Sequence, residues 1–543
     1  MNRLALYVFY EKNGEVLDHV IFYLNALKKI CQDVVCLVNG KISPKGILDL
    51  HNRGIEIVKR QNQGFDFGAW QYAFNDYLGE RLSGYDEVIL CNCSCYGPLY
   101  PFEELFKKMD EKNCDFWGLY KHPAIEGRFP AHLQSYFLVL RSPLIRSSEF
   151  KEYWEKLPVA KTWNEAVAHE TSFTQYFEDR GFVSESFIPT EEYATRYPNP
   201  PGVLGLELVK KFNFPLIKRK LFSEKYYCIY LNSRGTECKR LVDYLNRNPI
   251  YDNKFIFQDL NKTCTASHIR NRLHNNFIVN HKCASGKKNT LFTVLSFNSE
   301  KIEELFSYVK KLPKFGNVIV YTNDNTCATW KKKSKKINID VVHIDHDNKE
   351  IVYWIDAKNM FEYKYACFIN DCNIINSRIG LKNESYINHA WENIMYSEDY
   401  IAGVEKIFEE NPHIGLLMPP PPIFSDLRNG IINFGWGDRR PLAEKLYRRM
   451  NLTVPFDEKP EIPFFGMFWC RTQAFKPLFR YDWKQEDFTS PIDNFNSPTV
   501  RYVLQCMYSM ICQEEGFMSG WIMTEETASL LHDNLMYKLK YHV

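Results

Sequence analysis

The chain has 543 residues, of which 45% are hydrophobic and 25% are charged, and its formal net charge is +2. These values are typical of a globular protein, and a nearly neutral chain has no overall positive field that would recruit nucleic acid. No stretch approaches the roughly eighteen apolar residues that a membrane-spanning helix needs, so any membrane contact must be peripheral, and the length favours two domains of about 200 to 250 residues with a connector.

The sequence begins without the pattern of a secretory signal. Only seven apolar residues separate Arg3 from Glu11, and we recognise no secretory segment there. We therefore expect a cytoplasmic chain whose sixteen cysteines are reduced thiols.

Apolar runs alternate with amphipathic patterns through the first 120 residues. They predict strands at 4–10, 34–39, 55–59, 86–92 and 115–120, and helices at 15–30, 43–53, 67–78 and 101–112. Such alternation predicts a mostly parallel sheet with helices on both faces. Ligands of such sheets bind beyond the carboxyl ends of the strands, where the polar loops 61–68 and 92–97 fall.

The first polar loop follows a predicted strand and opens a predicted helix. Its sequence from residue 61 is Gln-Asn-Gln-Gly-Phe-Asp-Phe-Gly-Ala-Trp. Glycines at 64 and 68 let the backbone approach a ligand closely, and the helix start presents free amide groups. Asp66 could accept a hydrogen bond from a ribose or a base, or it could simply cap the helix. The residues alone leave both interpretations open.

The second polar loop falls where an acidic strand end would hold a divalent metal against a nucleotide diphosphate. A hard cation prefers carboxylate oxygens, and this loop offers only Asn92 and Ser94. Cys91, Cys93 and Cys95 invite a zinc interpretation, but alternate residues of a strand lie about 6.6 Å apart. Zinc–sulfur bonds of about 2.3 Å cannot join sulfurs so spread, which favours packing roles for these cysteines.

After residue 120 the pattern changes to a strand at 132–141 and helices at 149–157 and 163–180. Glu170 lies in the last helix, next to a histidine and hydroxyls that could tune it, and is the best candidate for a general base in the chain. The alternative is a solvated helix carboxylate.

The middle of the chain has a mixed pattern. We interpret 201–285 as a helical, partly basic connector between a domain at 1–200 and a second domain at 286–543. The basic stretches 218–220 and 331–336 are either solvated faces or contacts for anionic lipid head groups.

The second half repeats the order of the first. A strand, a helix and a strand are predicted at 291–297, 300–312 and 318–323, and an aromatic strand at 466–471. Gln505 precedes a glycine by the same eleven positions as Glu170 does. This similarity predicts two α/β domains of one fold.

Two features of the repeat bear on chemistry in the second half. Gln505 cannot take a proton, so the second domain lacks that base. Asn370 and Asp371 follow an apolar run, as Asn92 does in the first half, and would serve either a metal or sugar contact or a simple turn.

Taken together, these motifs resemble the rhamnan-synthesis F family of bacterial polysaccharide glycosyltransferases. In the first half the resemblance rests on the segments 62–70, 92–98, 132–137 and 214–218. In the second half it rests on 414–419, 434–437 and 466–469. The first-half motifs are fairly specific, and the resemblance covers most of the chain.

The resemblance implies two GT-A-like, Rossmann-type domains in tandem and a nucleotide-sugar-dependent glycosyltransferase. The donor would be dTDP-rhamnose or a UDP-sugar, and rhamnose, a related deoxyhexose or galactofuranose would pass to a lipid-linked glycan for capsule, O-antigen or cell-wall polysaccharide. The enzyme would work in the cytoplasm, peripherally at the inner face of the membrane, with other glycosyltransferases as further partners.

The resemblance also implies roles for individual residues. Donor binding would fall to Asn62, Gly64, Asp66, Asn92, Cys93 and Ser94; acceptor or sugar binding to His132 and Gln134; and second-domain contacts to Asn370, Asp371 and Trp469, with Asp371 as the candidate metal ligand. Glu170 would deprotonate the acceptor hydroxyl in an inverting displacement.

The chain departs from the family pattern in both halves. In the second half, Gln505 stands where that pattern has the helix glutamate, and the glycine loop near 348–350 is degenerate. Cys93 stands where that pattern has an aspartate, so Lys or Arg side chains rather than Mg²⁺ or Mn²⁺ could neutralise the diphosphate in the first domain. The alternatives are a bifunctional transferase with both domains active and a non-catalytic glycan-binding partner of an assembly complex.

Overall fold

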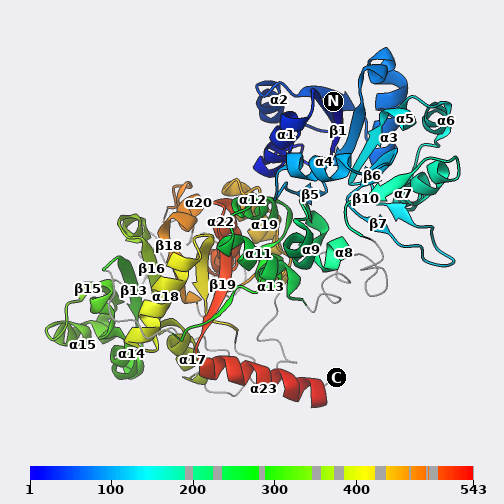
Figure 1. Ribbon diagram of the computed structural model, residues 1–543. Coiled ribbons are helices and arrows are strands. Elements are labelled where there is room, and N and C mark those ends of the chain that lie inside the picture. The colour runs from blue at the N-terminus through cyan, green and yellow to red at the C-terminus, as the bar shows by residue number, and fades with distance from the viewer. Residues whose placement is uncertain are drawn as a thin grey trace. The chain divides into compact units, whose positions relative to one another are not determined.

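A computed structural model describes residues 1–189, 200–223, 235–280, 288–344, 356–371, 384–421, 436–463, 466–484, 487 and 499–541. The chain forms two compact units, Met1–Asp259 and Leu260–Val543 (Figure 1). Residues 201–259 of the segment interpreted as a connector lie in the first unit, and 260–285 lie in the second. The second-half motif at 434–437 falls partly outside the described residues.

The first unit is built on a seven-stranded sheet with the order β10-β6-β9-β4-β1-β2-β3. Its strands are β1 (Arg3–Phe9), β2 (Asp33–Asn39), β3 (Glu56–Arg60), β4 (Glu87–Asn92), β6 (Phe116–Gly118), β9 (Phe137–Arg141) and β10 (Ser184–Ser186). Only β9 runs antiparallel to its neighbours in this sheet. From β1 the chain moves outward to β3 and then returns to β4 on the other side. The direction of winding therefore reverses between β1 and β4, and sheets of this kind bind ligands beyond the carboxyl ends of the strands at such a point.

Helices cover both faces of this sheet. The helices of the first unit are α1 (Asp18–Ile30), α2 (Pro44–His51), α3 (Phe65–Tyr72), α4 (Phe102–Asp110), α5 (Ser142–Ile145), α6 (Ser148–Lys156), α7 (Trp163–Glu178), α8 (Pro200–Val203), α9 (Gly205–Phe212), α11 (Glu237–Arg247) and the start of α12 (Lys254–Thr263). Alternate side chains of β1 point to opposite faces. Ala5, Tyr7 and Phe9 pack with α1, α2 and α4, whereas Leu4, Leu6 and Val8 pack with α3, α6 and α7.

Short strands add two small pairings to the first unit. β7 (Lys121–His122) pairs with β8 (His132–Leu133), and β5 (Cys95–Tyr96) pairs with β11 (Ile217–Lys218). The strand predicted at 132–141 is therefore split into β8 and β9. A turn at 134–136 separates them because the backbone amide of Ser135 donates to the Glu170 carboxylate rather than to a neighbouring strand.

The second unit contains an eight-stranded sheet with the order β12-β19-β17-β18-β16-β13-β14-β15. Its strands are β12 (Asn276–Ile278), β13 (Thr290–Ser296), β14 (Gly316–Thr322), β15 (Asp340–His343), β16 (Tyr365–Asn370), β17 (Ile414–Met418), β18 (Phe468–Arg471) and β19 (Met518–Met523). Again one strand, β18, is antiparallel to both its neighbours. Apart from the added edge strand β12, this is the order of the first sheet.

The register repeats as well as the order. Val8 of β1 pairs with Asn92 at the end of β4, and Leu295 of β13 pairs with Asn370 at the end of β16. The predicted fold class, two tandem α/β domains with Rossmann-type, mostly parallel sheets, is therefore confirmed. Between Pro200 and Leu273 the described residues are mainly helical, as expected for that segment.

The helices of the second unit include α13 (Ala266–Leu273), α14 (Ile302–Val309), α15 (Asp324–Ser334), α17 (Glu384–Met395), α18 (Glu398–Glu410), α19 (Arg440–Arg449), α20 (Lys476–Phe479), α22 (Thr499–Glu514) and α23 (Glu525–Tyr541). One face of the sheet packs on α19, α20 and α22. Within the described ranges, none of the helices combines the length and the apolar character needed to cross a membrane.

Candidate functional site

The side chain of Asn92 joins three segments at the carboxyl end of β4. Its Nδ2 donates to Oδ2 of Asp66 at 2.8 Å, while its Oδ1 accepts from the backbone N (3.1 Å) and the Oγ (2.6 Å) of Ser94. Asn92 is buried. The end of β4, the loop after it and the start of α3 are thereby joined through one amide group.

Two glycines shape the turn that carries Asp66. Gly64 has a φ of +73°, and a Cβ there would lie 2.9 Å from the Cα of Gly68. A Cβ on Gly68 would lie 2.3 Å from the carbonyl oxygen of Gln63, so neither position accepts a larger residue without a shift of the backbone. Asp66 follows in the first turn of α3. Asn62, the other predicted donor contact in this loop, is exposed.

Burial is the main reason that the pKa of Asp66 is raised to about 6. The hydrogen bond from Asn92 opposes the shift, the charge of Glu170 adds to it, and the charge of Lys218 opposes it. Asp66 is therefore within electrostatic reach of both side chains.

Replacing Asp66 by asparagine is expected to make thermal stability less sensitive to pH. A raised folded-state pKa means that the folded protein binds this proton more tightly than the unfolded chain does. The resulting stability is fully present below about pH 4 and is lost as the pH rises through about 6. Since asparagine stays neutral, the melting temperature of Asp66→Asn relative to wild type should rise across that window and then level off. Melting curves at a series of pH values test this, and a difference that is constant with pH would contradict it.

Glu170 reaches the same edge of the sheet from α7. Its Oε1 accepts hydrogen bonds from the backbone N (2.7 Å) and the Oγ (2.9 Å) of Ser135. Cys91 pairs with Phe137 in the antiparallel β4–β9 ladder, so Ser135, two residues earlier, lies beside the loop that follows β4. No hydrogen bond to Oε2 is seen within the part of the chain that the structure describes. The carboxylate is held by one oxygen and keeps the other for chemistry.

The predicted sugar-binding residues lie just before Ser135. His132 stacks on His122 with ring centroids 5.2 Å apart and an interplanar angle of 7°. Burial lowers the pKa of His132, while the Pro130 carbonyl and the charge of Glu170 oppose that shift. Gln134 is buried, and its Oε1 has no hydrogen-bond partner among the described residues. An unpaired buried acceptor is costly, which makes this oxygen a candidate for a ligand hydroxyl.

Lys218 is a site residue that sequence reasoning did not place. It pairs with Cys95 in the β5–β11 ladder. Its Nζ lies 3.4 Å from Oγ of Ser94 and 3.8 Å from the ring centroid of Tyr136. We call Asp66, Asn92, Ser94, Glu170 and Lys218 the edge cluster. The sequence signals for Lys218 are its place in the motif at 214–218 and in the basic stretch 218–220.

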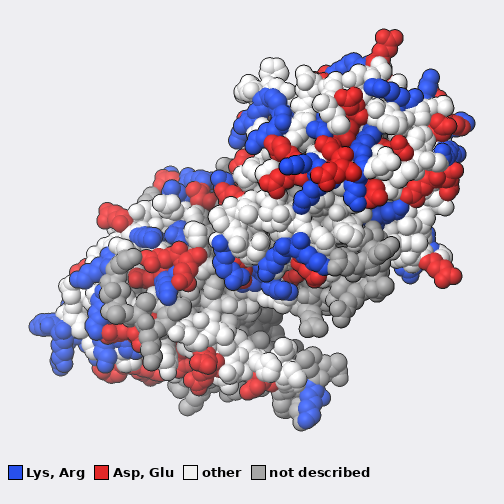
Figure 2. Space-filling view, in the orientation of Figure 1, with Lys and Arg blue, Asp and Glu red and all other residues white. Residues whose placement is uncertain are grey.

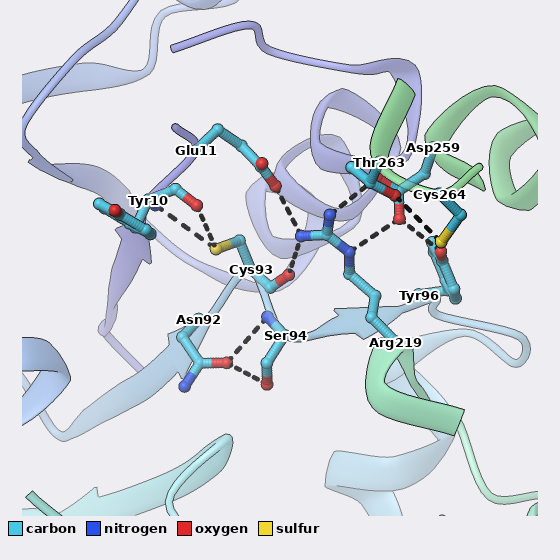
Figure 3. A network of polar contacts seen from close by, with 10 residues as sticks. All are labelled: Tyr10, Glu11, Asn92, Cys93, Ser94, Tyr96, Arg219, Asp259, Thr263 and Cys264. Carbon is cyan, nitrogen blue, oxygen red and sulfur yellow. Dashed lines mark hydrogen bonds and ion pairs between the residues drawn. The ribbon is translucent and has the colours of Figure 1, made fainter. Parts of the chain in front are cut away.

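Arg219 fastens the loop after β4 (Figure 3). Its Nη1 donates to Oε1 of Glu11 at 2.7 Å and to the carbonyl oxygen of Cys93 at 2.9 Å. Its Nε and Nη2 donate to the two carboxylate oxygens of Asp259 at 2.9 and 2.7 Å. Burial acts to raise the pKa of Asp259, but the charges of Arg219 and His19 outweigh it and hold that pKa below its ordinary value.

The donor set beyond β4 does not fit a divalent cation. At the position of the expected carboxylate, the Sγ of Cys93 lies 3.4 Å from both the backbone N and the carbonyl oxygen of Tyr10, and burial raises the pKa of the thiol to about 12. Asn92 Oδ1 is already engaged by Ser94. Within the described ranges, no three His, Cys, Asp or Glu side chains gather in a way that could hold a metal. Mg²⁺ and Mn²⁺ prefer oxygen ligands, and we derive no step through a metal.

Asp371 is the counterpart of Cys93 in the second unit. Its backbone N bonds to the carbonyl of Leu295 as that of Cys93 bonds to Val8. The carboxylate accepts from Ser296 Oγ at 2.8 Å, Phe297 N at 2.9 Å and Asn298 N at 3.0 Å, and it is fully buried. Through these contacts Asp371 fixes the loop after β13. Asn370 ends β16 beside it and is also buried.

Gln505 occupies the counterpart of the Glu170 position. A Cβ added to Gly466 would lie 2.4 Å from Nε2 of Gln505. Gly466 precedes β18 by two residues, as Ser135 precedes β9. The two helix side chains therefore face equivalent points of the two sheets. Trp469 is buried in β18, and its Nε1 donates to the carbonyl of Ile394 at 2.9 Å, which gives it a packing role.

Comparisons with known proteins were made for the whole chain. The family described as rhamnan synthesis protein F matches residues 34–517. An uncharacterised protein of Sinorhizobium fredii, y4gN, is 25% identical over 199 residues, which are 36% of this chain and 51% of that protein. The chain thus spans about half the length of the curated relative that it matches.

Two solved structures that match the chain share little sequence with it. A cytidylyltransferase from Leptospira borgpetersenii is 14% identical with a TM-score of 0.23, over 39% of this chain and 93% of that one. A protein from Desulfovibrio desulfuricans described as a nucleotide-diphospho-sugar transferase is 15% identical with a TM-score of 0.22, over 44% of this chain and 96% of that one. These scores carry no weight for this chain, and its fold rests on the sheet order above.

Proposed function

Because the chain belongs to the rhamnan synthesis protein F family, we propose that it is a glycosyltransferase that moves a sugar from a nucleotide-sugar donor to a glycan. The observation that carries this proposal is the edge cluster of the first unit. There a carboxylate fixed by one oxygen, Glu170, lies with Asp66 and Ser94 at the edge where sheets of this kind bind ligands. We assign catalysis to this unit.

In the proposed reaction the acceptor hydroxyl attacks the anomeric carbon from the side opposite the diphosphate. The new bond joins the acceptor oxygen to that carbon, the bond from the carbon to the diphosphate oxygen breaks, and the nucleoside diphosphate leaves with the electron pair. Oε2 of Glu170 takes the hydroxyl proton as a general base. Ser135 holds Oε1 so that Oε2 keeps its direction. A single displacement of this kind inverts the anomeric centre.

The remaining predicted residues are assigned to binding. Asp66 would accept a hydrogen bond from the donor ribose or base, and the backbone at Gly64 would lie against the donor together with Asn62 and Cys93. Gln134 Oε1, buried without a partner, would accept a hydroxyl of the sugar or the acceptor, and His132 would line the same region. Pairing the orphaned oxygen with a ligand would relieve the cost of leaving it unsatisfied.

The second unit is proposed as a glycan-holding or regulatory copy. A glutamine at the position of the base cannot accept the proton, and the Asp371 carboxylate is already occupied by three donors. The bifunctional alternative would need another base and another cation site in this unit.

The proposal extends to the identity of the donor and the acceptor. We propose dTDP-rhamnose or a UDP-sugar as donor and a lipid-linked surface glycan as acceptor, which would bring the chain to the inner face of the membrane. On the face drawn in Figure 2, acidic and basic side chains of the first unit are interspersed. Contact with anionic lipid stays a prediction for the basic stretches 218–220 and 331–336.

A panel of nucleotide sugars tests the proposal. Incubating the full chain with each donor and a lipid-linked glycan should release nucleoside diphosphate with one of them, and the product should have the opposite anomeric configuration to the donor. Release is measured by a coupled assay and configuration by nuclear magnetic resonance. Binding of the glycan without turnover of any donor would contradict the proposal and favour the non-catalytic binding partner.

A further inference from the structure

Two adjacent cations of the first unit have opposite surroundings. Arg219 is neutralised by two carboxylates, Glu11 at 2.7 Å and Asp259 at 2.7 Å. Lys218 is also partly buried, yet no carboxylate of the described residues lies within ion-pairing distance of its Nζ. Its recorded contacts are the Ser94 hydroxyl and the face of Tyr136. Charges that are removed from water are ordinarily paired. The surroundings of Lys218 are therefore those of a cation that binds an anionic ligand.

The backbone around Lys218 is attached to the loop after β4. β11 pairs with β5, which follows the loop after β4. The backbone N of Arg219 also donates to the carbonyl of Ser94 at 2.9 Å. The Arg219 guanidinium holds the carbonyl of Cys93 next to it. The ammonium is therefore held beside the loop where a donor diphosphate would lie, next to the Ser94 hydroxyl.

The leaving group of the proposed reaction needs a cation there. Negative charge grows on the nucleoside diphosphate as its bond to the sugar breaks, and a preorganised positive charge stabilises that state. Where a carboxylate could hold a metal for this purpose, this chain has a thiol with a pKa raised by burial. A lysine binds phosphate as a compact point charge, so it can act without a bound metal ion.

We propose that Lys218 supplies the positive charge that binds the donor diphosphate and stabilises its departure, in place of a divalent metal. The Ser94 hydroxyl donates its one proton to Asn92 Oδ1 in this structure, and would turn to the phosphate as a second donor. This inference rests on the proposed function, since it assigns the charge that the same site uses. Nucleoside diphosphates bind here without added metal. The Lys218 side chain contacts phosphate, and Arg219 acts by positioning the strand that carries it.

Calorimetric binding of dTDP and UDP, compared with thymidine and uridine, tests the proposal on the full chain. Wild type should bind one of the diphosphates equally well in EDTA and in Mg²⁺. Lys218→Met should weaken the binding of that diphosphate by about 10- to 100-fold, which corresponds to the loss of a hydrogen bond to a charged group. The affinity for the nucleoside should be unchanged. Lys218→Arg should keep most of the affinity, and Ser94→Ala should lose a smaller part. Lys107→Met, at an exposed lysine of α4, is the matched control.

The outcomes separate the two proposals. If neither diphosphate binds to wild type, the proposed function falls and this inference falls with it. If one binds but Lys218→Met weakens diphosphate and nucleoside alike, or if Mg²⁺ raises wild-type affinity more than about tenfold, only the role of Lys218 is overturned. Should Lys218→Met fold poorly by circular dichroism, the comparison of Lys218→Arg and Ser94→Ala with wild type in EDTA and in Mg²⁺ decides the question.

Discussion

Glu170→Gln is expected to reduce the turnover number for sugar transfer by about 10²- to 10⁴-fold, the usual contribution of a general base. Glutamine has nearly the same shape, and its Oε1 can accept both hydrogen bonds from Ser135. It cannot take the acceptor proton. Stability should therefore change by less than about 1 kcal/mol, and affinity for nucleoside diphosphate should be unchanged, because Glu170 is assigned to the acceptor side.

The measurement is steady-state release of nucleoside diphosphate, with melting temperature and diphosphate affinity recorded on the same samples. Glu165→Gln, an exposed carboxylate of the same helix, is the matched control and should keep nearly full turnover. Gln505→Glu places a carboxylate at the equivalent point of the second unit and should not restore activity to Glu170→Gln. Wild-type turnover in Glu170→Gln would remove the proposed base.

Arg219→Met is expected to destabilise the first unit by about 3 to 5 kcal/mol, the cost of leaving buried charge without its partner. The side chain of Asp259 is 2% exposed, and both of its oxygens accept hydrogen bonds from this guanidinium, with Tyr96 as a further donor to Oδ2. The substitution also releases the Cys93 carbonyl, so the loop beyond β4 should lose order (Figure 3). Diphosphate affinity should fall as well, although Arg219 is proposed to touch no ligand.

Chemical denaturation combined with hydrogen exchange gives the measurement, because exchange reports each unit separately. Protection should fall in residues 92–96 and elsewhere in the first unit while the second unit keeps its own. Arg81→Met is the control, since its partner Glu56 and Arg81 itself are 44% and 45% exposed and such pairs contribute about 0 to 1 kcal/mol. An equal loss in the free energy of unfolding for Arg219→Met and Arg81→Met would show that the buried network stabilises the unit no more than an exposed ion pair does.

The main strands of the first sheet could be predicted because each is a run of apolar residues bounded by polar turns. β1, β2, β3 and β4 begin and end within two residues of the predicted ranges. Elements of two or three residues, such as β5, β10 and β11, carry no such pattern and depend on their partners. The predicted strand at 132–141 was too long because Ser135 bonds to a helix side chain, and that tertiary contact has no local signal.

The same distinction applies to the candidate site. Asp66, Asn92 and Ser94 belong to loops that follow predicted strands, and parallel strands bring such loops to one edge. Lys218 and Arg219 come from a segment more than 120 residues further along the chain. The β5–β11 pairing and the bonds from Arg219 to the carbonyls of Cys93 and Ser94 bring them to the loop after β4. Their sequence is merely basic, and a basic stretch is equally compatible with a solvated face.

Because the two units repeat one fold, the second unit can serve as an internal control for the first. Its edge carries Asn370, Asp371 and Gln505 at the counterparts of Asn92, Cys93 and Glu170. The two units thus offer the same scaffold with different chemistry. Changes made at equivalent positions separate the effects of a reacting group from those of the fold that holds it.

A crystal structure of the full chain with its nucleoside diphosphate tests the central claim most directly. The account predicts the nucleotide beyond β1 and β4, with its phosphates within hydrogen-bonding distance of Lys218 Nζ and Ser94 Oγ and its ribose or base near Asp66. A nucleotide bound beyond β13 and β16 of the second unit, with the edge cluster of the first unit unoccupied, would contradict it.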